Sequence, residues 1–403
     1  MPACNWLEAL WKKLLLVFLV LVSTLQDCAN GKPQVPCFFI FGDSISDNGN
    51  NNNLVTLAKA NYPPYGIDFP AGITGRFTNG RNMVDFIAEF LGFDDYIPPF
   101  ATARDQEILT GVNYASGAAG IRSETGQQLG DRISMDRQLK NHRSTVSQII
   151  TMLGNQNSSA EYLSKCIYSV AIGSNDYINN YFLPKYFPTS SQYTQEQYAE
   201  ALVLQVSQQL KTLYECGARK VAVFGLGLLG CTLVEKASFG SNVGSLSCVD
   251  NVNNAVLLFN NRLKRLVLDY LNKSLTDANF IFVNSSGIAL SSSLSQAGRL
   301  LQNLKLLIFT RFATFAVGCE IHEMEFASGP KETNAPCCQV TGTGLGMAQC
   351  DPFGKSCSNR SQYTFWDAVH PTEDVYAGYA RRAYRAESPT DAYPFDIERL
   401  AQL

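Results

Sequence analysis

Short, continuously apolar segments alternate along the chain with longer segments whose apolar residues recur every three or four positions. Strands that are apolar throughout are typical of parallel sheets covered on both faces. Each apolar segment is followed directly by a glycine or an asparagine, which indicates where the strand ends. The predicted strands cover residues 37–41, 167–172, 220–224 and 280–283.

The segments between these strands predict helices, most clearly at 249–271, where apolar residues repeat with a period close to 3.6. The predicted helices cover residues 83–91, 135–153, 195–216 and 249–271. Alternating strands and helices predict a doubly wound α/β sheet. Ligands of such sheets bind beyond the carboxyl ends of the strands, where the polar residues that follow each strand would lie. We find no internal repeat and no linker, and we treat residues 32–403 as a single domain.

Residues 1–31 have the pattern of a targeting segment. Lys12 and Lys13 precede an apolar run at 14–25, which is about half the length needed to span a bilayer. Small residues follow at 29–31, so the pattern is typical of a secretory signal peptide. We expect cleavage near Gly31 and a secreted protein without a stable membrane span. The alternative is a membrane anchor.

Composition excludes several classes of protein. Of the 403 residues, 46% are hydrophobic and 17% are charged, which excludes disorder as the overall state. The formal net charge of −3 excludes a nucleic-acid binder that relies on bulk positive charge. The mean hydropathy of −0.05 excludes a polytopic membrane protein.

The cysteines and the sequons fit a secreted protein. There are 12 cysteines and no C-x-x-C pair, which disfavours a zinc ribbon or a thioredoxin-like site. Secretion makes disulfides the default, although Cys37 and Cys166 lie in apolar segments and are also compatible with buried thiols. Sequons for N-glycosylation occur at Asn157, Asn272, Asn284 and Asn359.

A nucleophile and a base are suggested by two distant segments. Ser44 follows the first predicted strand, but a serine is a poor nucleophile unless a base takes its proton. Asp367 and His370 lie three residues apart, so the carboxylate can accept the imidazole Nδ1–H and leave the other nitrogen free as a base. The structural alternatives are a helix N-cap for Ser44 and a surface histidine before a proline for His370.

Acyl transfer also requires hydrogen-bond donors for a developing oxyanion. Two segments supply candidates, the backbone N–H of Gly117 in a run of small residues and the side-chain amide of Asn175 just past a predicted strand. The structural alternatives are a small-residue turn and an asparagine in a turn.

Taken in order, four blocks resemble the plant GDSL esterase/lipase family of SGNH hydrolases. The blocks are Gly42-Asp43-Ser44, Gly117, Gly173-Ser174-Asn175-Asp176 and Asp367-Ala368-Val369-His370-Pro371, and the segment 50–80 is also typical of plant members. The resemblance extends over residues 36–395 apart from 298–328. It implies a flavodoxin-like three-layer α/β/α sandwich with a five-stranded parallel sheet.

The resemblance also implies an activity and its residues. Ser44, Asp367 and His370 would be catalytic, while Ser44, Gly117 and Asn175 would form the oxyanion hole. A secreted, monomeric esterase or lipase of the cell wall would then cleave a small ester or lipid through an acyl-enzyme, with no cofactor and no metal. The alternatives are an acyltransferase of cell-wall or cuticle polyester and an inactive wall-associated binding glycoprotein.

For the disulfides we expect two bridges that each close a short loop near the active-site end. These are Cys231–Cys248, whose loop the family shares, and Cys350–Cys357. Cys337 and Cys338 are adjacent in the sequence and would each need a separate partner.

Three other features are interpreted as unrelated to the function. The sequence at 225–230 matches G-x-G-x-x-G, but no helix is expected after it, which disfavours a dinucleotide site. Cys319, His322 and the glutamates near them lack metal-ligand spacing. His142 lies between basic residues and is expected on a solvated helix face.

Residues 298–328 interrupt the family pattern. One interpretation is a lid or a helix that contacts lipid beside an open site. The other, which we favour, is a stretch that was never selected to pack. It predicts that no catalytic residue lies in 298–328 and that deleting this stretch preserves or improves secretion and esterase activity. The lid interpretation instead predicts a selective loss on emulsified lipid.

Overall fold

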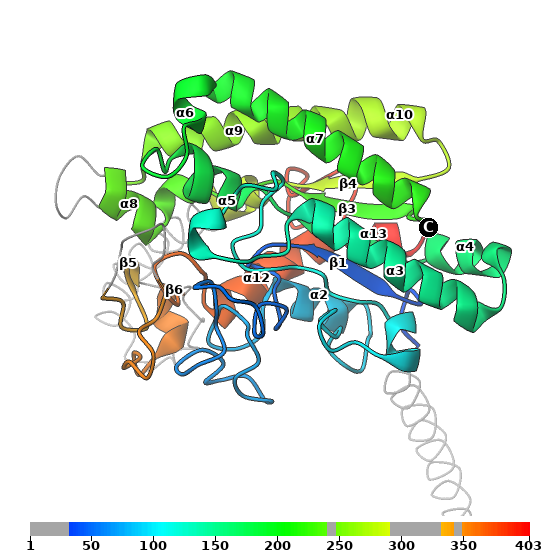
Figure 1. Ribbon diagram of the computed structural model, residues 1–403, viewed down its shortest axis with the longest axis horizontal. Helices are drawn as coiled ribbons and strands as arrows, with labels where there is room; N and C mark the ends of the chain where they lie inside the picture. The colour runs from blue at the N-terminus through cyan, green and yellow to red at the C-terminus, as the bar shows by residue number, and fades with distance from the viewer. Residues whose placement is uncertain (1–31, 240–246, 291–331, 342–348) are drawn as a thin grey trace, which may run out of the picture.

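The computed structural model describes residues 32–239, 247–290, 332–341 and 349–403 (Figure 1). Strands β1 (Phe38–Gly42), β2 (Ile167–Ala171), β3 (Lys220–Phe224) and β4 (Asn279–Val283) form a sheet in that spatial order, all parallel. The fifth strand, β7 (Ala392–Tyr393), pairs with β4. The predicted five-stranded α/β sheet is confirmed, with one correction: it is mixed, because β7 runs antiparallel to β4.

A further extended segment, 110–116, lies along the other edge of β1. Phe38 N–H donates to the Thr110 carbonyl at 3.0 Å, and Tyr114 N–H donates to the Ile40 carbonyl at 2.7 Å. The bridge between Ile40 and Asn113 is parallel. This segment therefore extends the parallel part of the sheet and carries the small residues that follow it to the end of β1.

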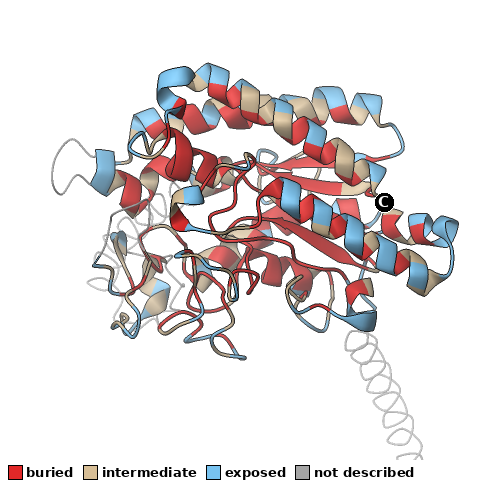
Figure 2. Cartoon of the chain, viewed as in Figure 1, coloured by how far each residue is buried: buried red, intermediate tan, exposed pale blue. Residues whose placement is uncertain are grey.

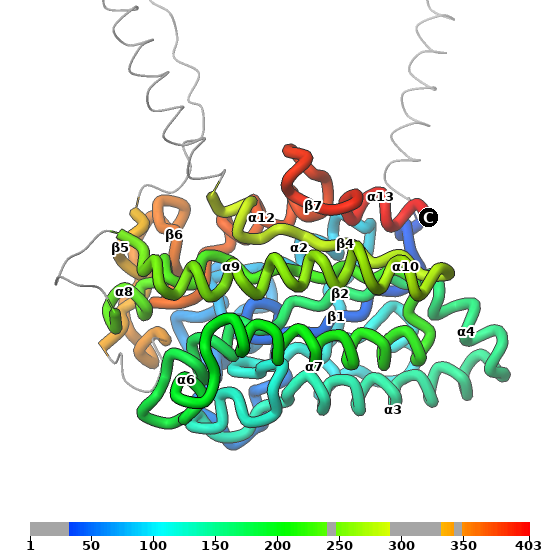
Figure 3. Tube along the Cα trace, turned by 90° about the horizontal axis from the view of Figure 1, so that it is seen from above, coloured from blue at the N-terminus to red at the C-terminus, as the bar shows by residue number. Residues whose placement is uncertain are grey.

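Helices cover both faces of the sheet, as Figures 1 and 3 show. One face packs against α3 (Met135–Leu153), α7 (Gln195–Glu215) and α9 (Asp250–Arg265). The other face packs against α2 (Met83–Phe90), α12 (Glu373–Tyr384) and α13 (Ile397–Ala401). The predicted helices 83–91, 135–153 and 195–216 agree with the structure within one residue. The fourth continues past α9 as a π-helical turn, Leu266–Leu271.

Shorter elements complete the described chain. They are α4 (Gln156–Ser164), α5 (Ser174–Asp176), α6 (Thr189–Gln192), α8 (Leu233–Phe239), α10 (Asn272–Ser274), β5 (Glu332–Pro336) and β6 (Tyr363–Phe365). Single helical turns lie at Asp105–Leu109, Gln127–Leu129, Tyr177–Tyr181, Leu229–Cys231 and Arg360–Gln362.

The strands form because both of their faces are buried (Figure 2). Phe39 and Phe41 point into the core beneath α3, α7 and α9, while Phe38 and Ile40 point into the core beside α2 and α12. Alternate residues of one strand therefore serve two cores, which is why the strand is apolar throughout. The layered packing holds the carboxyl end of β1 rigidly at one edge of the sheet.

His142 lies in the core, and the expectation of a solvated position is wrong. It is fully buried on α3, with Phe39 and Tyr168 edge-on to its ring and its Nδ1 3.2 Å from the Tyr114 hydroxyl. Burial lowers the pKa of His142 to about 3, because a charged imidazole would lose its hydration.

We expect His142 to weaken the fold in acid. Its pKa in the fold lies below that of the unfolded chain, near 6.5. Above pH 6.5 the imidazole is neutral in both the folded and the unfolded chain, so the free energy of unfolding keeps the full stability that depends on the neutral His142. Below pH 6.5, the unfolded state binds the proton first and the free energy of unfolding falls, by at most about 1.4 kcal/mol per pH unit down to about pH 3. Urea unfolding of the wild type and of His142→Phe, at pH 7 and pH 4.5, measures this. The variant should lose less stability between the two values, and an equal loss would contradict the assignment.

The described residues form four disulfides, and these correct part of the predicted pairing. Cys231–Cys248 is confirmed, whereas the predicted Cys350–Cys357 bridge is wrong. Cys337 pairs with Cys357 and Cys338 with Cys350, because the Cys357 N–H donates to the Cys337 carbonyl at 2.7 Å and so places those two cysteines side by side. Cys37 and Cys166 are not buried thiols but a disulfide that joins the starts of β1 and β2.

Several expectations fall outside the described residues. They concern the signal peptide at 1–31, the stretch 298–328, and Cys319 with His322. Within the described part of the chain, no helix is long and apolar enough to cross a membrane. Nor do the described residues gather three or more histidine, cysteine or acidic side chains in a way that could hold a metal ion.

Candidate active site

Ser44, His370 and Asp367 form one chain of hydrogen bonds at the carboxyl end of β1. The Ser44 Oγ lies 2.8 Å from His370 Nε2, and His370 Nδ1 lies 2.7 Å from Asp367 Oδ2. Asp367 is fully buried and His370 is 6% exposed, while Ser44 is half-buried at the surface. The ring of Phe77 packs on the imidazole at 5.0 Å. A hydroxyl bonded to an imidazole that is itself bonded to a carboxylate can act as an activated nucleophile.

The loop that carries His370 is shaped by the Asp367 carboxylate. Its Oδ1 accepts from the backbone N–H of Val369 at 2.8 Å and of His370 at 2.7 Å. The loop closes where Trp366 N–H donates to the His370 carbonyl at 2.8 Å. The three-residue spacing that suggested the pair thus corresponds to a tight turn in which the aspartate holds both the backbone and the ring.

Tyr65 is a fourth member of this network that the sequence analysis did not assign. Its hydroxyl donates to Asp367 Oδ2 at 2.7 Å and accepts from Cys350 N–H at 3.1 Å. Burial and the nearby Asp367 raise the pKa of Tyr65 well above its usual value, so the hydroxyl keeps its proton. The only signal in the sequence was that Tyr65 lies in the segment 50–80 that resembles the plant family.

Asn175 faces Ser44 across a small cavity. A cavity of about 40 Å³ is lined by Ser44, Asn175 and His370 together with apolar side chains that include Ala118 and Leu129. Asn175 Oδ1 accepts from Asn179 Nδ2 at 2.7 Å, and Asn175 Nδ2 donates to the Ala119 carbonyl at 3.0 Å. These bonds fix the orientation of the amide and leave its second N–H available.

Gly117 lies in the same loop as expected, but its N–H is already engaged. It donates to Asp47 Oδ2 at 2.9 Å. Asp47 Oδ1 accepts from Gly49 and Asn50, each at 2.8 Å. The carboxylate therefore ties the segment after Ser44 to the loop of small residues.

Three buried carboxyl groups lie beside the candidate site residues: Asp43 precedes Ser44, Asp176 follows Asn175, and Asp47 accepts from the Gly117 N–H. Burial raises the pKa of Asp43 to about 7 and the pKa values of Asp47 and Asp176 to about 6. Asp176 accepts from the N–H groups of Ile121 and Arg122 and from the Thr125 hydroxyl. Hydrogen bonds to these carboxylates offset part of the cost of burying charge.

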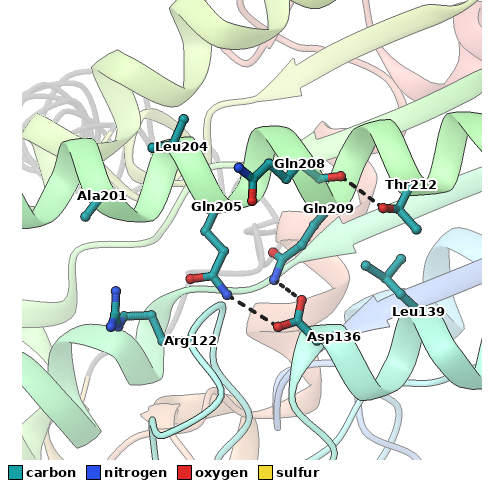
Figure 4. A pocket seen from close by; sticks show the side chains of 9 residues that line it. All are labelled: Arg122, Asp136, Leu139, Ala201, Leu204, Gln205, Gln208, Gln209 and Thr212. Carbon is teal, nitrogen blue, oxygen red and sulfur yellow. Dashed lines mark hydrogen bonds between the residues drawn. The ribbon is translucent and has the colours of Figure 1, made fainter.

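A second hollow lies away from this cluster, between α3 and α7 (Figure 4). It encloses about 480 Å³ and is lined mainly by polar side chains. Asp136 accepts from Gln209 Nε2 at 2.8 Å there. The residues that line it do not pair a nucleophile with a base, so the smaller cavity beside Ser44 is the better candidate for catalysis.

The glycine-rich stretch 225–230 is followed by a short helix, α8, so the expectation of no helix is wrong. Four of the backbone N–H groups that could cradle a phosphate are nevertheless used within the protein. They are those of Gly225, Leu226, Leu229 and Gly230, which donate to the Val283 carbonyl, Asn260 Oδ1, the Gly227 carbonyl and Asn253 Oδ1. In the first turn of α8, Val234 N–H donates to the Ala368 carbonyl. Helix α8, which follows the motif, therefore contacts the loop that carries His370.

The four sequons differ in their surroundings. Asn157 and Asn359 are exposed. The side-chain nitrogens of Asn272 and Asn284 instead donate to the carbonyls of Phe280 at 2.9 Å and Thr390 at 3.0 Å. In the folded protein, Asn157 and Asn359 present the more accessible amides.

Comparison with known proteins identifies the relatives of this chain. A family model described as GDSL-like lipase/acylhydrolase matches residues 38–383. One GDSL esterase/lipase of Arabidopsis thaliana is 49% identical over 375 residues, which cover 93% of this chain and 94% of the relative. Another from the same plant is 45% identical over 390 residues, which cover 97% and 99%.

Proposed function

This chain belongs to the GDSL-like lipase/acylhydrolase family of ester hydrolases, and we propose that it cleaves carboxylic esters with Ser44, His370 and Asp367. The observation that carries the proposal is the unbroken path from Ser44 Oγ to His370 and on to Asp367, with links of 2.8 and 2.7 Å. Such a path has the geometry that a serine nucleophile and its base require.

The reaction proceeds in two steps. Ser44 Oγ attacks the ester carbonyl as His370 Nε2 takes its proton, and the alcohol leaves with a proton returned by His370. Water, activated by the same imidazole, then attacks the acyl-enzyme and releases the acid. Asp367 holds the ring and stabilises the imidazolium. Asn175 Nδ2 and the Ser44 N–H donate to the oxyanion of both tetrahedral intermediates.

We further propose that the enzyme acts outside the cell on small esters or lipids. The four disulfides support passage through the secretory pathway, because disulfides persist in oxidising compartments. The small cavity beside Ser44 and its apolar lining support an acyl group as the bound part of the substrate.

Labelling and hydrolysis test this function together. The secreted protein should react once with a fluorophosphonate, at Ser44, and should hydrolyse a p-nitrophenyl ester series from acetate to palmitate. Products with water alone and with added glycerol would distinguish hydrolysis from acyl transfer. A protein that neither labels at Ser44 nor hydrolyses any ester of the series would contradict the proposal.

We expect Asn175→Ala to lower kcat by about 10²–10³-fold with little change in KM, as for loss of one oxyanion donor. The substitution removes the Nδ2 donor, but it also removes the hydrogen bond between Asn179 Nδ2 and Asn175 Oδ1. Asn179→Ala removes only that second interaction and is therefore the matched control. Steady-state kinetics on p-nitrophenyl butyrate measures both. If the variant changed KM alone, Asn175 would be a substrate-binding residue instead.

A further inference from the structure

The Tyr65 hydroxyl is directed at Asp367 by a backbone amide. Its oxygen accepts from the Cys350 N–H at 3.1 Å, and its O–H donates to Asp367 Oδ2 at 2.7 Å. A hydroxyl has a single hydrogen, which rotates to suit its partners. Because the Cys350 N–H occupies one lone pair of the Tyr65 oxygen, the hydrogen is left to point at the carboxylate. Both Tyr65 and Asp367 are fully buried, so bulk solvent does not reach this bond.

The Cys350 backbone that directs Tyr65 is itself fixed in two further ways. Its carbonyl accepts from the Tyr62 hydroxyl at 3.0 Å, and the rings of Tyr62 and Tyr65 meet edge to face with their centres 5.4 Å apart. The Cys350 side chain forms a disulfide with Cys338. The residue that contacts the Tyr65 hydroxyl is therefore held by a hydrogen bond and by a covalent bond.

The disulfide also reaches the segment that carries Asp367. At its other end, the Cys338 N–H donates to the Trp366 carbonyl at 2.9 Å, and Trp366 directly precedes Asp367. Tyr65, Trp366 and the two cysteines pack in one buried cluster and are each at most 2% exposed. One end of the bridge is thus bonded to the residue before Asp367, and the other end to the tyrosine that donates to Asp367.

The neighbouring bridge, Cys337–Cys357, lacks this connection. The Cys337 N–H donates to the Phe365 carbonyl at 3.0 Å, and the Cys337 carbonyl accepts from the Cys357 N–H at 2.7 Å. Within the described chain, neither cysteine hydrogen-bonds to Tyr65 or Asp367. The two bridges share their surroundings but differ in their contact with Tyr65, so Cys337–Cys357 is a matched control.

We propose that Tyr65 and the Cys338–Cys350 disulfide are positioning groups for Asp367, with the disulfide acting through Tyr65. The bridge holds the Cys350 N–H against the Tyr65 hydroxyl, and the hydroxyl holds Asp367 Oδ2, the oxygen that contacts His370 Nδ1. The inference rests on the proposed ester hydrolysis, and it gives a disulfide a role in catalysis besides that of stabilising the fold. Hydrogen bonds to a carboxylate stabilise its charge, so Tyr65 also limits how strongly Asp367 stabilises a protonated imidazole.

The pH profile of Tyr65→Phe distinguishes positioning from a structural role. The variant leaves Asp367 with one donor fewer, so the carboxylate stabilises the imidazolium of His370 more strongly. We expect kcat to fall by about three- to tenfold while KM stays within about twofold. The acid limb of kcat/KM, which reports groups of the free enzyme, should move up by about 0.5–1 pH unit. Loss of packing alone would change stability without moving the limb, and an unmoved limb would overturn the assignment.

A shift of the limb in this variant reports Tyr65 itself. Among the described residues, the other titratable groups that act on Asp367 or His370 are Asp43, Tyr62 and Tyr376, and all three are unchanged in Tyr65→Phe. If the wild type hydrolyses no ester, the proposed function fails. If the wild type hydrolyses esters and Tyr65→Phe keeps the wild-type limb, only the present inference fails.

Removing the disulfide tests whether it acts through Tyr65. Cys338→Ala combined with Cys350→Ala should reproduce the fall in kcat and the shift of the limb seen in Tyr65→Phe. Adding Tyr65→Phe to this pair should change neither further, because both changes break the same link. Cys337→Ala combined with Cys357→Ala should leave the limb in place. Fully additive losses, or an equal shift in the control pair, would overturn the role of the bridge.

If the protein without the Cys338–Cys350 bridge is not secreted in a folded form, Tyr62→Phe takes its place. This change removes the hydrogen bond to the Cys350 carbonyl and leaves the disulfides intact. The limb should move in the same direction as in Tyr65→Phe, by a smaller amount. A wild-type profile in folded Tyr62→Phe would overturn the proposal.

Discussion

Replacing Ser44 with alanine is expected to lower kcat/KM for p-nitrophenyl esters by about 10⁵–10⁶-fold, the range seen when a triad serine is lost. Among the described residues, the Ser44 side chain hydrogen-bonds only to His370 Nε2, and Ser44 is half-buried, so the fold should change little. Steady-state hydrolysis and thermal unfolding, measured on the same preparation, separate the two effects. Ser46→Ala is the matched control, because Ser46 is a buried serine two residues away whose hydroxyl has no partner among the described residues.

Two outcomes would count against this mechanism. Residual activity above a tenth of the wild type in Ser44→Ala would exclude Ser44 as the nucleophile. The serine and the imidazole also act as one unit, so Ser44→Ala combined with His370→Ala should be no slower than either single variant. Additive losses would mean that the two side chains serve different steps.

Replacing Asp367 with asparagine is expected to lower kcat by about 10⁴-fold near neutral pH. Four groups of the described residues donate to the carboxylate: the N–H groups of Val369 and His370, His370 Nδ1 and the Tyr65 hydroxyl. An asparagine presents one NH₂ group to these donors, so the imidazole is forced into the tautomer that cannot accept the Ser44 proton. Hydrolysis rates between pH 6 and 9 measure the loss.

Tyr65→Phe is the control for this variant. It removes one donor to Asp367 but leaves the bond between Asp367 and His370, so we expect a loss of about tenfold or less. If Asp367→Asn kept full activity near pH 7, another carboxylate would have to orient His370.

The fold was predictable where burial leaves a pattern in the sequence. The strands at β1 to β4 and the helices α2, α3 and α7 agree with the apolar segments and the helical periodicity. β7 has only two residues, too few to show alternation. The helical spacing of His142 from Leu139 and Ile149 would have predicted its burial, because the three residues share one face of α3 and are all buried. The prediction of a solvated position relied instead on the basic residues next to His142 in the sequence.

The site was predictable only as far as local motifs describe it. Ser44, Asp367 and His370 stand in short blocks, and the structure brings them together. The bond from Tyr65 to Asp367 spans 302 residues and that from Gly117 to Asp47 spans 70. Neither leaves a periodic or spacing signal. The disulfide error has the same origin, because loop length favoured Cys350–Cys357, whereas the fold places Cys357 beside Cys337, 20 residues away in the sequence.

The edge of β4 that faces away from β3 is blocked against pairing with a strand of a second molecule. The Asn272 side chain accepts from Phe280 N–H and donates to its carbonyl, both at 2.9 Å, as a neighbouring strand would. Beyond it β7 pairs with Phe282, and Asn284 N–H donates to the Asp391 carbonyl at 2.7 Å. Open sheet edges are where proteins recruit a foreign strand and begin to aggregate. A second molecule cannot lengthen the sheet along this stretch of β4 without first displacing Asn272 or β7, so the edge is protected against self-association at high concentration.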